Sequence, residues 1–318
     1  MAARRSRRNG EKMSRDDFDR LFHDVCNWGR WGVNDEKGTL NYLTPAMVKR
    51  GASTVKSGRT VSMARPIETA AGPDNSTPAV HRMTRLYNAP SEGSEEPQFV
   101  GDYLGSETHG NAYSHIDALC HVSYQGRLYN GRPHDLVTQN GAKSMDITQY
   151  ARGIVARGVL LDIPKLRKTK WLDPGDAVTA EELEEAEKAE GVKLQEGDVL
   201  VFRVGQYLRR LELGAWDVEV EGRAGLDPRA MRLLHERKVS AFLPDGDGET
   251  IPNQVEGVRY PIHALQIASM GLACGDSLQL EDLSKACQEE NRWEFMVAIA
   301  PLVLPGGTGS LANPIAVF

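Results

Sequence analysis

The chain has 318 residues, of which 40% are hydrophobic and 26% are charged, and its formal net charge is -6. This composition is ordinary for a globular protein with one large core or two smaller ones. The negative charge, and the lack of a basic stripe with interleaved aromatic residues, argue against nucleic-acid binding. No window approaches the roughly 18 apolar residues that a membrane span needs, so a membrane partner is not expected either.

The N-terminal segment, residues 1–13, carries the only basic run of the chain. We predict that it is a disordered basic tail, the alternative being a contact with an anionic surface. No apolar stretch follows the run, so it does not have the pattern of a secretory signal. The cysteines are far apart and form no CxxC pair, which is typical of a reduced, cytoplasmic protein without disulfides; they are Cys26, Cys120, Cys274 and Cys287.

Capping residues mark the start of four predicted helices. Ser14 with Asp17, and Thr179 with Glu182, have the spacing of an N-cap and its partner three residues further on. Proline after a threonine or an aspartate marks two more starts, because proline fits the first helical turn; these are Thr44-Pro45 and Asp227-Pro228. A further helix is predicted over residues 280–287.

Long apolar runs predict the buried strands. Residues 153–162 (GIVARGVLLD) and 198–204 (DVLVFRV) are nearly continuous and rich in β-branched side chains, which is typical of central strands covered on both faces. Shorter strands are predicted at 60–63, 240–243, 295–301 and 315–318. Because apolar strands alternate with amphipathic helices, we predict an α/β fold in which residues 14–318 form one domain.

Residues 109–121 (HGNAYSHIDALCH) hold three of the eight histidines and an aspartate. On a strand, His115 and Asp117 point to the same face, and this pair of ligand types suits Zn²⁺ or Mn²⁺. His121 stays on that face if the strand continues, or swings back over the metal if residues 118–120 turn. The alternatives are that Asp117 orients a histidine from outside the coordination sphere, or that this is a buried strand whose histidines are satisfied by hydrogen bonds.

Other candidate groups stand alone in the sequence. His263 is the best isolated candidate for a general acid or base, although it could also be a hydrogen-bonded core histidine. Asp276 and Glu281 could supply a carboxylate to a metal, but both also lie where a helix N-terminus would favour an acid. Asp245 and Asp247 alternate with glycines without completing a calcium-binding loop, and we interpret them as part of a polar surface turn.

Three aromatic residues lie in glycine-rich settings, where they could hold an aromatic substrate. Trp28 and Trp31 fall in the loop over residues 28–41, and Tyr129 precedes the turn signal Asn130-Gly131. The two tryptophans could equally form a hydrophobic plug on the surface of the domain. A small-molecule substrate, aromatic or cyclic, is the partner that we expect.

Three stretches resemble the cyclase family of metal-dependent hydrolases, which includes bacterial kynurenine formamidases and isatin hydrolases. They are residues 114–121 (SHIDALCH), residues 157–162, and the pattern that runs from His263 to Pro314. Residues 29–41 are similar to a longer-chain subset of that family. The resemblance implies a swivelling β/β/α fold with a mixed central sheet and flanking helices, a Zn²⁺ or Mn²⁺ cofactor, and a homodimer or homotetramer.

The resemblance also implies roles for individual residues. His115 and Asp117 would be metal ligands, and His121 would bind a second metal or act in catalysis beside the first. His263 would transfer the proton. The expected reaction is hydrolysis of the C–N bond of a formamide or cyclic amide, in which hydroxide generated at the metal attacks the carbonyl.

This sequence departs from the family pattern at two positions. The family histidine four residues before His115 is replaced by Asn111, so either His109 takes its place or Asn111 binds through its amide oxygen. The carboxylate after His263 is matched by Asp276, with Glu281 as the alternative. These departures leave open a lactone hydrolase, a cyclase or dehydratase of natural products at the same site, and a binding protein without catalytic activity.

Overall fold

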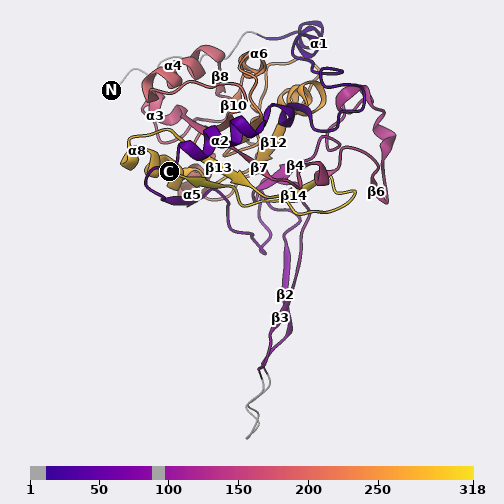
Figure 1. Cartoon of the computed structure of the whole chain (residues 1–318), viewed down its shortest axis with the longest axis vertical. Helices are drawn as coiled ribbons and strands as arrows, with labels where there is room; N and C mark the ends of the chain where they lie inside the picture. The colour runs from indigo at the N-terminus through magenta and orange to yellow at the C-terminus, as the bar shows by residue number, and fades with distance from the viewer. Residues whose placement is uncertain (1–11, 88–96) are drawn as a thin grey trace, which may run out of the picture.

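The structure is a computed structural model that describes residues 12–87 and 97–318 (Figure 1). The predicted basic tail lies almost entirely in residues 1–11, outside the described residues. The N–H of Met13 donates to the carbonyl of Gln254 at 2.8 Å, and Met13 is buried. The chain is therefore anchored to the body of the protein from Met13 onward.

A nine-stranded mixed sheet forms the centre of the described fold (Figure 1). Its order is β1 (Thr60–Ser62), β15 (Ile315–Val317), β13 (Glu294–Ile299), β7 (Ile154–Asp162), β9 (Val199–Arg203), β11 (Ala241–Pro244), β12 (Ala273–Asp276), β4 (His115–Asp117) and β14 (Gly309–Leu311). The four strands from β7 to β12 run parallel, and the strands outside them pair antiparallel. The predicted α/β fold with a mixed central sheet is confirmed.

The central strands are buried because both faces of the sheet are covered. Along β7, Val159 and Leu161 join one hydrophobic core, while Leu160 between them joins the other. The same alternation holds in β9, where Leu200 and Val201 belong to opposite cores. A strand apolar at every position needs packing partners on both sides, so helices or loops must lie on both faces of this sheet.

Eight α-helices accompany the strands in the described part of the chain: α1 (Arg15–Asp24), α2 (Pro45–Ser53), α3 (Ile163–Arg167), α4 (Ala180–Glu190), α5 (Gln206–Leu213), α6 (Met231–Glu236), α7 (Pro261–His263) and α8 (Glu281–Glu290). A π-helix over Ala264–Met270 continues α7 directly. Short 3-10 turns lie at Gly38–Tyr42, Tyr129–Gly131, His134–Leu136, Ile147–Tyr150 and Pro228–Ala230. No described helix has the length and apolar character to cross a membrane.

The predicted helix starts are found where the capping residues stand. The Ser14 hydroxyl accepts the N–H of Asp17 at the start of α1. The capping box of α4 is complete, because Thr179 accepts the N–H of Glu182 and the Glu182 carboxylate accepts the N–H of Thr179. Before α2, by contrast, the side chain of Thr44 caps none of the described backbone N–H groups.

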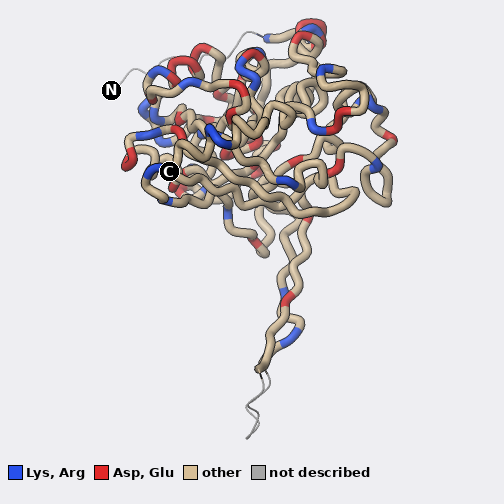
Figure 2. Tube along the Cα trace, viewed as in Figure 1, with Lys and Arg blue, Asp and Glu red and all other residues tan. Residues whose placement is uncertain are grey.

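Strands β2 (Val80–Arg85) and β3 (Gly101–Gly105) form a two-stranded ribbon that projects from the body (Figure 1). The sequence did not indicate this arm, because all six side chains of β2 are exposed and a strand without a buried face has no regular apolar alternation. Two further small pairs join β5 (Val137–Thr138) to β6 (Gly141–Ala142) and β8 (Ala177–Val178) to β10 (Gly225–Leu226). Charges of both signs are interspersed over the body, and few lie on the described part of the arm (Figure 2).

Candidate metal centre and active site

Strand pairing places four reactive side chains on one face of the sheet. Strand β4 lies antiparallel to β12, with Asp117 opposite Cys274 and His115 opposite Asp276. Directly opposed residues in a sheet point to the same face, so the four side chains form two adjacent cross-strand pairs. Glu281 takes no part, because its carboxylate pairs with Arg203. Asp276 is thus the carboxylate that the fold brings to the His115 motif.

His115 presents a free nitrogen to two carboxylates. Its Nδ1 lies 3.2 Å from the carbonyl of Tyr113, which fixes the proton on Nδ1 and leaves the lone pair on Nε2. That Nε2 lies 3.6 Å from Asp117 Oδ1 and 3.7 Å from Asp276 Oδ2. These distances are too long for strong hydrogen bonds and suit ligand atoms that share a metal ion.

Asp117 is buried with one oxygen unused. The residue is only 1% exposed, and its Oδ2 has no hydrogen-bond partner among the described residues. Burial by itself would raise the pKa of Asp117, but His121, His109 and His115 more than offset it and hold that pKa well below its usual range. A buried carboxylate oxygen without a donor is costly unless a cation contacts it, so this atom fits a metal ligand.

His121 returns over the site because the strand stops at Asp117. The N–H of His121 donates to the carbonyl of Ala118 at 3.0 Å, which closes a turn and brings its Nε2 to 4.0 Å from Asp117 Oδ2. Of the two courses that the sequence left open, the structure shows the turn. Burial, together with the nearby His109, lowers the pKa of His121 to about 4, so its imidazole is neutral at pH 7.

His109 does not present a free nitrogen. Its ring stacks on that of His121, with 3.6 Å between the centroids. Its Nδ1 lies 2.7 Å from Asp117 Oδ1, and its Nε2 lies 2.9 Å from Thr308 Oγ1. Gly309 leaves room for the ring, since an added Cβ would lie 2.7 Å from its Cε1. Although its nitrogen is near enough to join His115 and Asp117 as a ligand, this geometry fits a residue that orients Asp117.

His263 is held on both sides by carboxylates. At the end of α7, its N–H and its Nδ1 lie 2.8 and 3.0 Å from Glu249 Oε1, and its Nε2 lies 3.4 Å from Asp276 Oδ2. Burial opposes the charged form, but the hydrogen bonds to Asp276 and Glu249 raise the pKa of His263 well above its ordinary value. The ring therefore carries a proton on each nitrogen beside the other candidate ligands.

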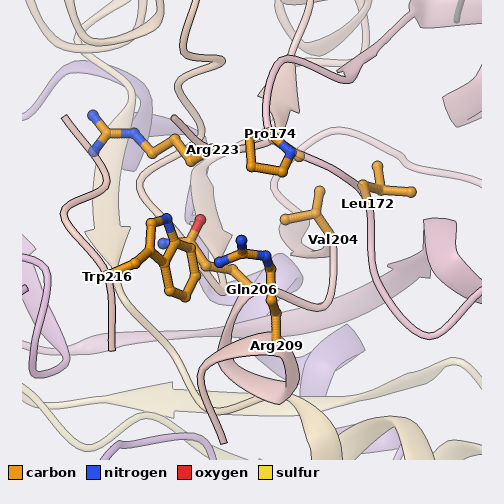
Figure 3. A pocket seen from close by; sticks show the side chains of 8 residues that line it. Leu172, Pro174, Val204, Gln206, Arg209, Trp216 and Arg223 are labelled. Carbon is orange, nitrogen blue, oxygen red and sulfur yellow. The ribbon is translucent and has the colours of Figure 1, made fainter. Parts of the chain in front are cut away.

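These residues face a cavity of about 290 Å³. It is lined by His109, Gly110, Asn111, His115, Asp117, His121, Val122, Glu219, Arg223, Asp247, Tyr260, His263 and Asp276. A second cavity behind Arg223 has only about 10 Å³, about the space of one water (Figure 3). The larger cavity is therefore the one that can take a substrate.

The loop after β11 is the part of the site that sequence reasoning missed. We interpreted Asp245 and Asp247 as part of a polar surface turn, and that was wrong. Asp245 and Glu249 are 0% exposed, and Asp247 pairs with the buried Arg223 at 2.6 Å. The missed signal was position, because alternating acids that follow a central parallel strand lie at its carboxyl end, where α/β sheets bind ligands.

The three predicted pocket aromatics are not at the cavity. Tyr129 is fully buried with its hydroxyl on Asp35 at 3.0 Å, and the Trp28 indole N–H donates to the carbonyl of Ala268. Trp31 packs edge-on against Tyr42. All three serve the packing of the N-terminal loop, and none is among the described residues that line the cavity. The expectation that they hold the substrate is corrected accordingly.

The donor atoms fit a divalent metal ion. Two groups have ligand atoms that lie within 4.8 Å of one another: His109, His115 and Asp117, and Asp117, His263, Cys274 and Asp276. Both groups contain Asp117, the residue with the unpartnered oxygen. The fold and this cluster together define an α/β protein with a candidate metal centre at one end of its central sheet.

A family model supports this class. The Cyclase model, described as “Putative cyclase”, matches residues 62–247, more than half of the chain. The chain therefore belongs to the cyclase family, which confirms the resemblance seen in the sequence. No curated protein matches the chain.

Solved structures share the fold. A crystal structure described as a novel cyclase has a TM-score of 0.82 at 28% identity and covers 93% of this chain and 99% of that chain. Isatin hydrolase A from Labrenzia aggregata has a TM-score of 0.54 at 19% identity and covers 83% and 94%. The isatin hydrolase A from Ralstonia solanacearum has a TM-score of 0.52 at 22% identity and covers 87% and 99%. At these identities the two isatin hydrolases show a common fold.

Proposed function

We propose that this protein is a metal-dependent hydrolase that cleaves the C–N bond of a formamide or cyclic amide, with Zn²⁺ or Mn²⁺ as cofactor. The observation that carries the proposal is the convergence of His115 Nε2, the unpartnered Asp117 Oδ2 and Asp276 on one cavity. His115, Asp117 and Asp276 would hold the ion. When bound, it supplies Lewis acidity, which polarises a carbonyl and makes water acidic enough to attack near neutral pH.

The surrounding histidines supply the proton transfers. His121 is neutral at pH 7, so its Nε2 can accept the proton that the attacking water loses. His263 carries a proton on Nε2 at the cavity wall, and Glu249 fixes its ring through Nδ1. His263 can therefore protonate the leaving nitrogen, the step without which an amine is a poor leaving group.

The cavity favours a compact substrate. Its volume of about 290 Å³ is at the small end of ligand sites. Among the described lining residues, Tyr260 is the only aromatic side chain besides the histidines, and Val122 is the only aliphatic one. The support for an amide substrate is the pairing of a metal site with a proton donor, and the shared fold with isatin hydrolases is consistent with it.

Metal content and turnover test the proposal together. We expect about one or two equivalents of Zn or Mn in the purified protein by plasma mass spectrometry, and hydrolysis of N-formylkynurenine or isatin. The His115→Ala variant should lose the metal and the turnover, since even changes outside the coordination sphere cost about 10–100-fold in affinity. His134→Ala, an exposed histidine outside the cavity, is the matched control. A folded wild type that takes up neither metal after reconstitution would refute the proposal.

A further inference from the structure

Cys274 is the member of the two cross-strand pairs that the proposed function does not use. It lies opposite Asp117, on the same face of the sheet as His115 and Asp276. Its Sγ is 3.4 Å from Asp276 Oδ1. The sulfur also lies within 4.8 Å of a ligand atom of Asp117 and of His263. A thiol is therefore built into the floor of the candidate metal centre.

The position of Cys274 differs from that of the other cysteine near the site. Cys120 is also buried, but its N–H donates to the carbonyl of Met145, and it belongs to neither group of candidate ligands among the described residues. Cys274 is 0% exposed and so has no access to solvent through which it could react. Packing alone needs only a small apolar side chain at that position.

A second and independent observation points to a cation between these groups. Asp117 is 1% exposed, its Oδ2 lacks a partner among the described residues, and it faces Cys274 across the strand pair. An ion held there would satisfy this oxygen while lying within reach of the sulfur. Four ligands in two adjacent cross-strand pairs can converge on one ion, because opposed Cβ atoms in a sheet are only about 4.5–5.5 Å apart.

We infer that Cys274 Sγ is a further ligand of the metal ion, which makes the centre selective for Zn²⁺ over Mn²⁺. This inference rests on the proposed function, since it concerns the same ion. On binding, the S–H bond breaks, a sulfur–metal bond forms, and the proton leaves to solvent without any change of oxidation state. Thiolate is a soft ligand that favours Zn²⁺, whereas Mn²⁺ prefers oxygen donors.

X-ray absorption of the zinc-loaded wild type tests the inference without any substitution. We expect a sulfur neighbour at about 2.3 Å, in addition to nitrogen and oxygen neighbours at about 2.0–2.2 Å. A shell of nitrogen and oxygen alone would overturn the role of Cys274 and leave the hydrolase proposal standing. Failure of the wild type to bind zinc, cobalt or manganese would overturn both, so the two failures can be told apart.

Variants then separate the sulfur from the packing. Cobalt added to the wild type should give a sulfur-to-cobalt charge-transfer band, which Cys274→Ser should lose and Cys120→Ser should keep. Serine can keep the hydrogen bond to Asp276, and Cys274→Ala serves if the serine variant does not fold. We expect zinc affinity to fall about 100-fold in Cys274→Ser, at the upper end of what outer-shell changes cost, with manganese affinity changed less than about threefold because oxygen donors remain. Equal losses for both metals would overturn the inference.

Discussion

Two buried charge clusters stand at the carboxyl ends of parallel strands in the same sheet, and they differ in whether their charges are satisfied. In the first, Arg203 at the end of β9 pairs with Asp162 at the end of β7, at 2.8 Å, and with Glu281 at 2.7 Å. In the second, Asp117 Oδ2 has no partner in the described chain and faces a cavity. Charges that neutralise one another hold elements together, whereas unsatisfied ones around a cavity mark a place for a ligand.

The largest expected effect comes from breaking the paired cluster. Arg203→Leu leaves Asp162 and Glu281 without their cation, so the free energy of unfolding should fall by about 3–5 kcal/mol. Metal content per folded molecule should not change. Chemical denaturation measures the first and plasma mass spectrometry the second. Arg232→Leu removes a pair that is about half exposed on both sides and should cost less than about 1 kcal/mol. A loss of metal in folded Arg203→Leu would contradict the division between the clusters.

The next effect separates orientation from binding at the metal cluster. Glu249→Gln keeps an acceptor for His263 but removes the negative charge that holds its imidazole protonated. We expect kcat to fall about 10–100-fold, as for other residues that orient a reacting group, with KM nearly unchanged. Steady-state kinetics against Glu256→Gln, an exposed substitution, measures it. An effect confined to KM would show that Glu249 acts on substrate binding instead.

The smallest effect concerns the one exception in the paired cluster. Glu190 accepts the N–H of Asp162 with Oε1, but its Oε2 has no partner among the described residues. Burial, with a smaller contribution from Asp162, raises its pKa to about 8 from the ordinary value of 4.5. Folding therefore favours the protonated acid, and the stability contributed by this group is full below pH 4.5 and is lost as the pH rises through about 8.

Glu190→Gln should remove this pH dependence. Between pH 4.5 and 8 the wild type should lose stability relative to the variant, with a slope of at most about 1.4 kcal/mol per pH unit. Denaturation midpoints across that range, compared with those of Glu185→Gln on the exposed side of α4, provide the measurement. Parallel curves for wild type and variant would show that Glu190 is already ionised in the folded protein.

Local chemistry made much of this predictable. The capping box of α4 and the apolar runs of β7 and β9 follow from short-range geometry, and they were read correctly. The arm of β2 and β3 was not indicated, because both of its faces are exposed and no alternation marks it. The acidic loop after β11 looked like a surface turn, since the sequence does not show that the strand before it is central.

The sequence by itself determined which side chains could act together along one strand. Successive residues of a strand alternate by covalent geometry, so His115 and Asp117 share a face wherever β4 lies. Only the tertiary structure decided that β12 pairs with β4, which brings Asp276 and Cys274 to that face, and that the turn after Asp117 returns His121. These contacts depend on long-range strand pairing and on where the strand ends, and neither is encoded in the local alternation of side chains.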